Sequence, residues 1–246
     1  MTMRDLLVRG LLAGLLASVL AFGFARMFGE PSVNAAIALE DSLYAQNGEP
    51  SEPEIVSRSI QSTLGLGTGL AVLSVAFGGL FAIAFAFAYG RIGNLGVRGT
   101  ALFVVLVGFG ALYVVPFLKY PPNPPTIGEA ETIAQRTALY FGMVLLSLVA
   151  TAGAIVLQRR LAETRSNWDA TLIASACFLV IITVAYLAMP EVNEVPDAFP
   201  AVVLWKFRVA SLGMQLVLWL SIGIAFGALT ERATQPSARA LAPAER

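Results

Sequence analysis

Long apolar runs separated by short polar segments dominate the chain. Six of these runs are each close to the ~20 residues that an α-helix needs to cross a bilayer, and they cover residues 6–28, 62–89, 99–117, 137–157, 170–189 and 209–229. They lack the period-2 alternation of barrel strands, and a backbone in hydrocarbon must form its hydrogen bonds within its own segment. The pattern therefore predicts an all-α, polytopic membrane bundle of six transmembrane helices. We expect a single domain over residues 1–232 and a short polar cytoplasmic tail at 233–246.

The first apolar run admits a second interpretation. Arg4 and Arg9 precede the stretch LLAGLLASVLAFGFA, which is similar to a secretory signal peptide with a small-residue cleavage site. Cleavage would leave five spans and would not change their orientation.

Composition and charge add the orientation. The chain is 57% hydrophobic and 13% charged, against about 25% charged in ordinary globular domains. Because short loops rich in Lys and Arg stay cytoplasmic, the positions of the basic residues predict that both termini are cytoplasmic. The outer loops then hold eleven acidic and five basic side chains, which would concentrate cations at the outer surface. The alternative is that these acidic loops merely follow the topology.

Three outer connections share a pattern. Each is followed by an arginine near the start of the next helix, in RSIQSTLG from Arg58, RTALYFGM from Arg136 and RVASLGM from Arg208. The spacing indicates three helical-hairpin repeats in parallel orientation, as in some transporters. These arginines either reach lipid phosphates or pair with hairpin carboxylates and hold the loops over a central cavity.

One outer connection, PFLKYPPNPPTIG at 116–128, is rich in proline. Proline fixes φ and donates no backbone hydrogen bond, so the segment should end its helix and form a stiff lip. Lys119, Tyr120, Trp205 and Lys206 fit an interfacial belt of aromatic and cationic side chains. The residues expected at a mouth or in holding the loops are Arg58, Lys119, Asn123, Arg136 and Arg208.

Several chemistries are excluded. The chain has no histidine and no G-x-x-x-x-G-K-[ST] motif, so a Ser-His-Asp triad, an H-E-x-x-H zinc site and a P-loop are absent. Cys177 is the sole cysteine, and no Asp, Glu, Lys or His lies in the middle of a span. Gln215 is the candidate pathway residue there, with an interhelical hydrogen bond as its alternative role. We expect no enzyme activity and no resident cofactor.

Sequence blocks in three separate loops carry a family resemblance. FGEPSVNAAIALE, VPFLKYPPNPPTIGEAETIAQRT and NEVPDAFPAVVLWKFRVASLG, in this order, resemble the CbtA family of predicted cobalt transporter subunits over nearly the whole chain. The resemblance implies movement of Co²⁺ across the bacterial cytoplasmic membrane for cobalamin synthesis. It also implies a small one-span partner like CbtB, whose tail is rich in histidine.

The chain departs from that family where metal would bind. Its first outer loop lacks the histidine-rich stretch that members often carry, and Asn34 stands where the family motif commonly has Asp. A divalent ion would therefore meet oxygen ligands, which suit weak coordination of hard or borderline ions. The candidate metal ligands are Glu30, Glu40, Asp41, Asn193, Glu194 and Asp197, with Asn34 beside them.

The sequence thus predicts a multi-pass membrane transport protein or transporter subunit for Co²⁺ or a related divalent cation, which its acidic outer loops gather. The alternative is a structural or accessory subunit that docks a partner protein through its outer hairpins and carries no cargo. A carrier of a small organic anion that uses the three arginines is a third candidate. The expected partners are the lipid bilayer, the one-span subunit and a second copy of the chain, with no nucleic acid.

Overall fold

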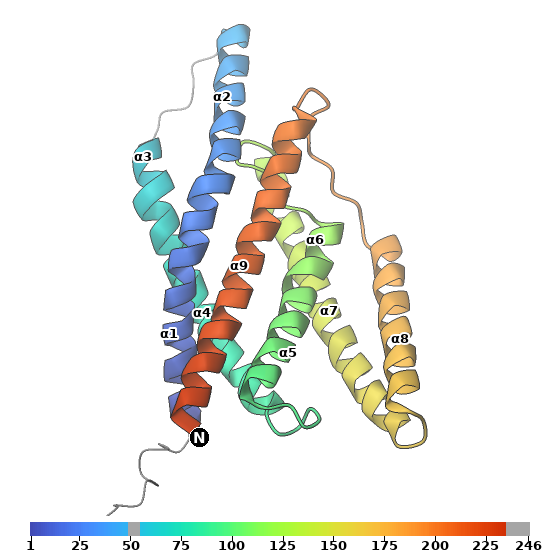
Figure 1. The fold of residues 1–246 in the computed structure, drawn as a ribbon. Coiled ribbons are helices and arrows are strands. Elements are labelled where there is room, and N and C mark those ends of the chain that lie inside the picture. The colour runs from blue at the N-terminus through green and yellow to red at the C-terminus, as the bar shows by residue number, and fades with distance from the viewer. Residues whose placement is uncertain (49–54, 235–246) are drawn as a thin grey trace, which may run out of the picture. The chain divides into compact units, whose positions relative to one another are not determined.

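The structure, a computed structural model, describes residues 1–48 and 55–234 (Figure 1). All the regular secondary structure in these residues is helical. The elements are the α-helices α1 (Met3–Phe24), α2 (Glu30–Asn47), α3 (Arg58–Ile60), α4 (Leu66–Ala88), α5 (Val97–Phe109), α6 (Val115–Lys119), α7 (Ile133–Ala162), α8 (Asn167–Ala188) and α9 (Ala201–Thr234), the π-helical turns η1 (Ala25–Gly29), η2 (Gln61–Gly65) and η3 (Gly110–Val114), and the 3-10 turn η4 (Ala130–Thr132). Joined end to end, these form six helices long and apolar enough to cross a membrane: Met3–Asn47, Arg58–Ala88, Val97–Lys119, Ala130–Ala162, Asn167–Ala188 and Ala201–Thr234. The predicted all-α class with six spans is confirmed.

The first helix extends well past its predicted apolar run. The run ends at residue 28, but the helix continues through GEPSVN to Asn47, where the sequence predicts an outer loop. Pro31 has no N–H to offer the preceding turn, and the turn just before it widens to a π-turn in which the amide of Glu30 donates to the carbonyl of Ala25. A widened turn is a known way to accommodate a proline inside a helix. The same arrangement recurs at η3, which precedes Pro116.

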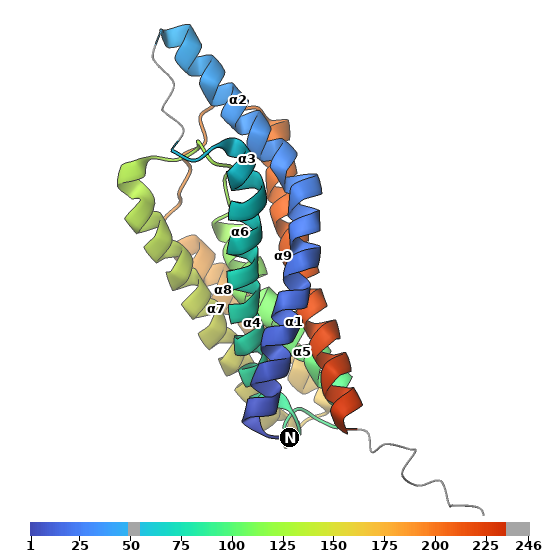
Figure 2. The ribbon, with the colours of Figure 1, turned by 90° about the vertical axis from the view of Figure 1, so that its left-hand side faces the viewer.

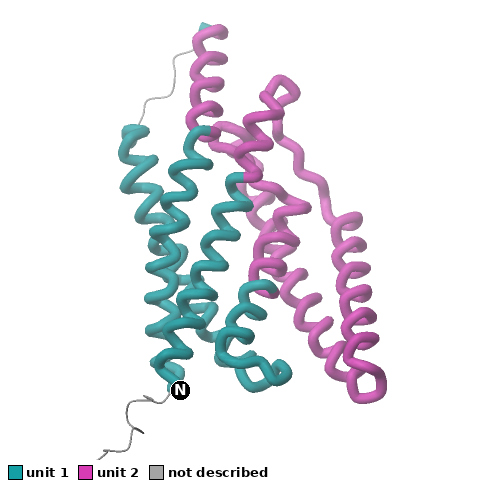
Figure 3. The backbone as a smooth tube through the Cα atoms, in the orientation of Figure 1, with its two compact units in different colours: residues 1–31, 48–106, 210–246 teal, residues 32–47, 107–209 magenta. Residues whose placement is uncertain are grey.

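The chain divides into two compact units (Figure 3). Unit 1 comprises Met1–Pro31, Gly48–Leu106 and Ala210–Arg246, and unit 2 comprises Ser32–Asn47 and Val107–Val209. The expectation of one domain over 1–232 stays a prediction, and most of the expected polar tail lies outside the described residues.

In unit 1, the helices α1 and α4 lie side by side in both views (Figures 1 and 2). Small residues let their backbones approach. A Cβ on Gly14 would overlap the carbonyl of Ser74, and one on Gly78 would overlap the carbonyl of Gly10. Close approach through small residues is how membrane helices gain packing energy, because lipid chains are as apolar as the side chains themselves.

The helix α9 adds an aromatic layer to unit 1. The ring of Phe226 packs edge-on against Phe81 and Phe85, with ring centroids 5.2 and 4.9 Å apart. Val105 of α5 covers Gly223 of α9. The start of α1, the turn between α4 and α5, and the end of α9 lie at the same end of this unit (Figure 1). That arrangement accords with both ends of the chain lying on one side of the membrane. The predictions that this side is cytoplasmic and that the chain contains three helical-hairpin repeats stay predictions.

Unit 2 is built on a hairpin of α7 and α8. Its buried core contains Val115, Met143, Ala150, Ile182 and Ala185. Large apolar side chains on the outward faces are exposed in both units, for example Val19 at 68% and Leu187 at 83%. Such faces suit contact with lipid chains rather than with water.

The close approach of α1 and α4 gives a direct test. We expect Gly14→Ala to lower the free energy of unfolding by about 1–3 kcal/mol, because the added methyl group forces two backbones apart. Gly23→Ala in the same helix is the matched control, since a Cβ there meets nothing within 4 Å. Thermal unfolding of both variants in detergent measures the difference, and equal melting temperatures would show that this contact is not tight.

Candidate functional site

Glu30 forms an ion pair at the junction of η1 and α2. Its carboxylate Oε2 contacts the guanidinium of Arg58 from α3, and Nη1 of Arg26 lies 4.0 Å from the same oxygen. Glu30 is only 7% exposed, and no other ionisable side chain is buried among the residues that the structure describes. A buried carboxylate is tolerated when a charge partner offsets its lost hydration, and two arginines do so here.

Glu194 forms a second ion pair, inside unit 2. Its Oε2 lies 3.2 Å from Nε of Arg136 in α7, at an angle that makes no hydrogen bond. The same carboxylate accepts hydrogen bonds from the Thr132 hydroxyl at 2.5 Å and from the Glu129 amide at 3.0 Å. Nη2 of Arg136 donates to the Glu129 carbonyl at 3.0 Å. These contacts fasten the loop at 189–200 to the start of the α7 helix.

The contacts of Glu194 also lower its pKa. The hydrogen bond from Thr132 is the largest cause, and the Glu129 amide and the Arg136 charge add to it, against the effect of burial. Each of these donors favours the charged form of a carboxylate. Glu194 is therefore ionised down to a lower pH than an ordinary glutamate.

The proline-rich lip is held by contacts from α8 and α9. Nη2 of Arg208 donates to Oδ1 of Asn123 at 2.9 Å, and its Nε donates to the Pro122 carbonyl at 3.3 Å. The ammonium of Lys119 donates to the Tyr186 carbonyl at 2.8 Å, and the Tyr120 hydroxyl donates to the Pro190 carbonyl at 2.8 Å. The prolines offer carbonyls but no amide hydrogens, so side-chain hydrogen bonds fix this segment. Arg208 of α9 donates to it, and its own Lys119 and Tyr120 donate to carbonyls of α8 and of the loop that follows α8.

The three arginines therefore contact protein groups rather than standing free. Arg58 pairs with Glu30 of the first long helix, and Arg136 pairs with Glu194 of the loop at 189–200. Arg208 differs, because both its hydrogen-bond acceptors are uncharged. Whether the three surround one cavity stays a prediction.

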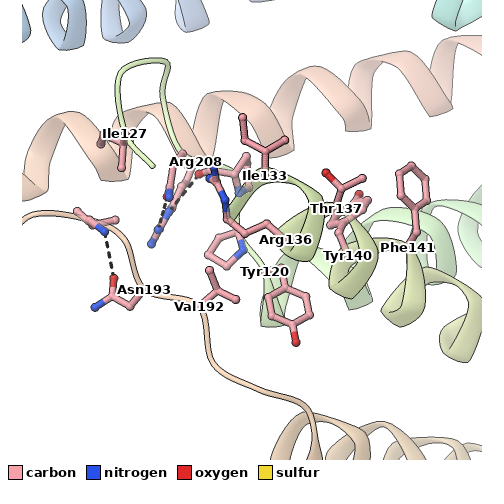
Figure 4. Close-up of a pocket in the computed structure, with 14 residues that line it drawn as sticks. Tyr120, Ile127, Ile133, Arg136, Thr137, Tyr140, Phe141, Val192, Asn193 and Arg208 are labelled. Atoms are coloured by element: carbon pink, nitrogen blue, oxygen red, sulfur yellow. Dashed lines mark hydrogen bonds between the residues drawn. The ribbon is translucent and has the colours of Figure 1, made fainter. Parts of the chain in front are cut away.

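A pocket of about 480 Å³ opens in unit 2 between the lip, the start of α7 and the loop at 189–200 (Figure 4). Its lining includes Arg136, Arg208 and Tyr140, together with apolar side chains such as Ile133 and Phe141. Among the described residues, no carboxylate lines it. The pocket therefore differs from the carboxylate-lined vestibule that a cation route predicts.

The predicted metal ligands are spread over both units. Glu30 belongs to unit 1, whereas Glu40, Asp41, Asn193, Glu194 and Asp197 belong to unit 2. Asp41, Asn193 and Asp197 are exposed, and Oδ1 of Asn193 accepts from the Val195 amide at 3.4 Å. Within the described residues, no three or more Asp, Glu, Cys or His side chains group so as to hold a metal ion. The proposed ligand set stays a prediction.

Gln215, the predicted pathway residue, lies in the part of α9 that belongs to unit 1. Its Oε1 is buried and accepts no hydrogen bond from the described residues. A buried amide oxygen without a donor is unusual, because desolvation costs free energy that a hydrogen bond would offset.

Some contacting residues carried no signal in the sequence. Thr132 and Tyr186 bind partners that lie 62 and 71 positions away along the chain. A helix-capping motif can be recognised from neighbouring residues in the sequence. Hydrogen bonds between residues this far apart have no such local sequence signal. For Glu30, the adjacent Pro31 was the available sequence signal, because a proline inside a helix distorts the preceding turn.

These observations define a class: an integral membrane protein with six helices able to span a bilayer, one buried carboxylate among its described residues, and ion pairs near the ends of its apolar stretches. The family model described as "Probable cobalt transporter subunit (CbtA)" matches residues 3–231. The chain therefore belongs to the CbtA family. No match was found among curated proteins or among solved structures.

The ion pair of Glu30 predicts an asymmetry between its two arginines. We expect Arg58→Gln to lower the free energy of unfolding by about 1–3 kcal/mol, because it leaves a buried carboxylate with one distant partner. Arg26→Gln is the matched control and should cost less than about 1 kcal/mol, because that arginine is exposed. The double variant with Glu30→Gln and Arg58→Gln should recover part of the loss. Equal losses of unfolding free energy in Arg58→Gln and Arg26→Gln would contradict the conclusion that Arg58 is the main charge partner of Glu30.

The contacts of Glu194 predict a pH dependence. Because folding lowers its pKa from the ordinary 4.5, its contribution to stability is fully present above pH 4.5 and is lost as the pH falls through the lowered value. The gap in melting temperature between the wild type and Glu194→Gln should therefore shrink below pH 4.5. Glu191→Gln, at an exposed position of the same loop, should show no such change. A gap that stays constant to lower pH would refute the coupling.

Proposed function

We propose that the protein is the membrane-embedded subunit of a transporter that moves Co²⁺ or a related divalent cation across the bacterial cytoplasmic membrane. The observation that carries this proposal is the family match over residues 3–231. The six apolar spans supply the membrane setting. The acidic outer connections supply a local excess of negative charge that attracts cations.

Glu30 is the carboxylate that the proposal places at the start of the route. It is buried, and its side chain is held by an arginine from the neighbouring helix of unit 1. A divalent ion that reaches this oxygen would compete with Arg58 and displace its guanidinium from the carboxylate. Carboxylate oxygens suit hard and borderline divalent ions.

Gln215 is the proposed oxygen ligand at depth. Its buried Oε1 lacks a hydrogen-bond donor in the described part of the chain, so an ion with part of its water shell removed could occupy that position. An uncharged ligand at depth would bind weakly and release readily, which conduction requires.

The family description as a subunit supports a partner polypeptide in the complete transporter. A small one-span protein is the proposed partner. Histidine on such a partner would add the nitrogen ligands that this chain lacks.

Uptake of radioactive Co²⁺ into cells tests the proposal with any native partner in place. In a strain that lacks this chain, restored wild type should raise the initial uptake rate. The double variant Glu30→Gln with Arg58→Gln should lower that rate by about tenfold, the factor for each 1.4 kcal/mol of lost interaction with the ion. The double change removes both charges, so it leaves no unpaired buried group.

Glu131→Gln is the matched control, because Glu131 is an exposed carboxylate of another outer connection. It should leave the rate within about twofold, as expected for screened surface charge. Competition by excess Ni²⁺, Mn²⁺ or Mg²⁺ then defines the cargo. Equal accumulation of every one of these ions with and without the chain would reject transport and favour an accessory subunit.

A further inference from the structure

The pocket of unit 2 contains one charge that no carboxylate of the described residues neutralises. Arg136 is paired with Glu194, whereas Arg208 has no carboxylate within salt-bridge distance among the described residues. Both side chains line the pocket (Figure 4). The pocket thus has a net positive charge, located on the Arg208 guanidinium.

The hydrogen bonds of Arg208 orient its guanidinium and use only some of its N–H donors. Its Nε donates to the Pro122 carbonyl and its Nη2 to Oδ1 of Asn123, which leaves three of the five N–H donors of a guanidinium unused. Both acceptors belong to the proline-rich lip, in which the φ angle of each proline is fixed. The side chain is therefore held in place before any ligand arrives, which reduces the entropy lost on binding.

The rest of the lining combines polar and apolar groups. Thr137, Tyr140 and Asn193 offer hydroxyl and amide groups, while Ile127, Ile133 and Phe141 offer apolar surface. A ligand that fits has an oxyanion for the guanidinium and an apolar portion beside it. Guanidinium groups bind phosphate oxygens with favourable, often bidentate geometry.

We propose that this pocket binds a phosphate oxyanion, with Arg208 as its principal charged contact. The pocket is formed by loops and by the first turns of α7 and α9, and helix ends of a membrane protein lie at the depth of lipid headgroups. Two sources of this chemistry are an anionic phospholipid and free inorganic phosphate. The site is independent of the proposed cation transport, because none of the lining residues in the described part of the chain is a carboxylate.

Native mass spectrometry of the purified full chain in detergent tests the proposal. The probes are dioctanoyl phosphatidylglycerol, dioctanoyl phosphatidylcholine and inorganic phosphate. We expect saturable binding of phosphatidylglycerol or of inorganic phosphate. A preference for phosphatidylglycerol over both other probes identifies a lipid site, and binding of inorganic phosphate alone identifies a free-anion site.

Arg208→Gln should weaken that binding about tenfold to a hundredfold, the range expected for lost hydrogen bonds to a charged group. Lys206→Gln is the matched control, because it removes the same charge from an exposed position two residues earlier in α9. The Lys206→Gln variant should bind the probes with the same affinity as the wild type. Thr137→Phe keeps Arg208 but fills the pocket, so it should also lose binding and serves if Arg208→Gln fails to fold.

Several results would overturn the proposal. One is the absence of saturable binding of every probe to the wild type. Another is equal loss in the Arg208 and Lys206 variants, which would indicate general electrostatic attraction to a basic helix end. A third is unchanged binding in Thr137→Phe, which would place the anion elsewhere.

Discussion

A lipid bilayer offers no hydrogen-bond partner to a backbone and little solvation to a charge, and this constraint shapes the whole molecule. It requires continuous helices, which the chain supplies six times. It also moves ionisable side chains out of the middle of the apolar stretches, to positions where each must contact water or a charge partner. Two ion pairs form there, between Glu30 and Arg58 and between Glu194 and Arg136. The features of interest therefore lie near the ends of the apolar stretches.

Proline and glycine determine how those connections are made. Pro31 is retained inside a helix because a π-turn precedes it, and that turn places Glu30 where Arg58 reaches its carboxylate. In the lip at 116–128 the consecutive prolines instead end the helix, and the carbonyl of Pro122 accepts a hydrogen bond from Arg208 of α9. Thr126 and Gly128 there have positive φ angles of 80° and 118°, a strained conformation for threonine. Proline is thus accommodated inside one helix and terminates another.

The sequence was sufficient to predict the membrane spans but insufficient to predict which residues contact one another. Apolar runs predict spans because hydropathy is a local property, and the predicted run at 99–117 corresponds to the helix Val97–Lys119. The helix over residues 30–47 was missed, because a proline and several polar residues usually mark a loop. Arg136 was recognised by its position near a helix start. Its partner Glu194 lies 58 positions later, and that choice depends on packing that no local pattern encodes.

For the proposed cation route, the ion pairs decide how strongly an ion could bind. A carboxylate that already has an arginine partner offers an ion only the difference between two attractions, and the ion must also give up part of its hydration shell. A site of this kind binds weakly. Weak binding is a defect in a storage protein, but it is an advantage in a transporter, whose ligands must release the ion on the far side. The Arg58 guanidinium would then serve as the exchangeable counter-ion that neutralises Glu30 between one cation and the next, so that the buried carboxylate is never left without a charge partner.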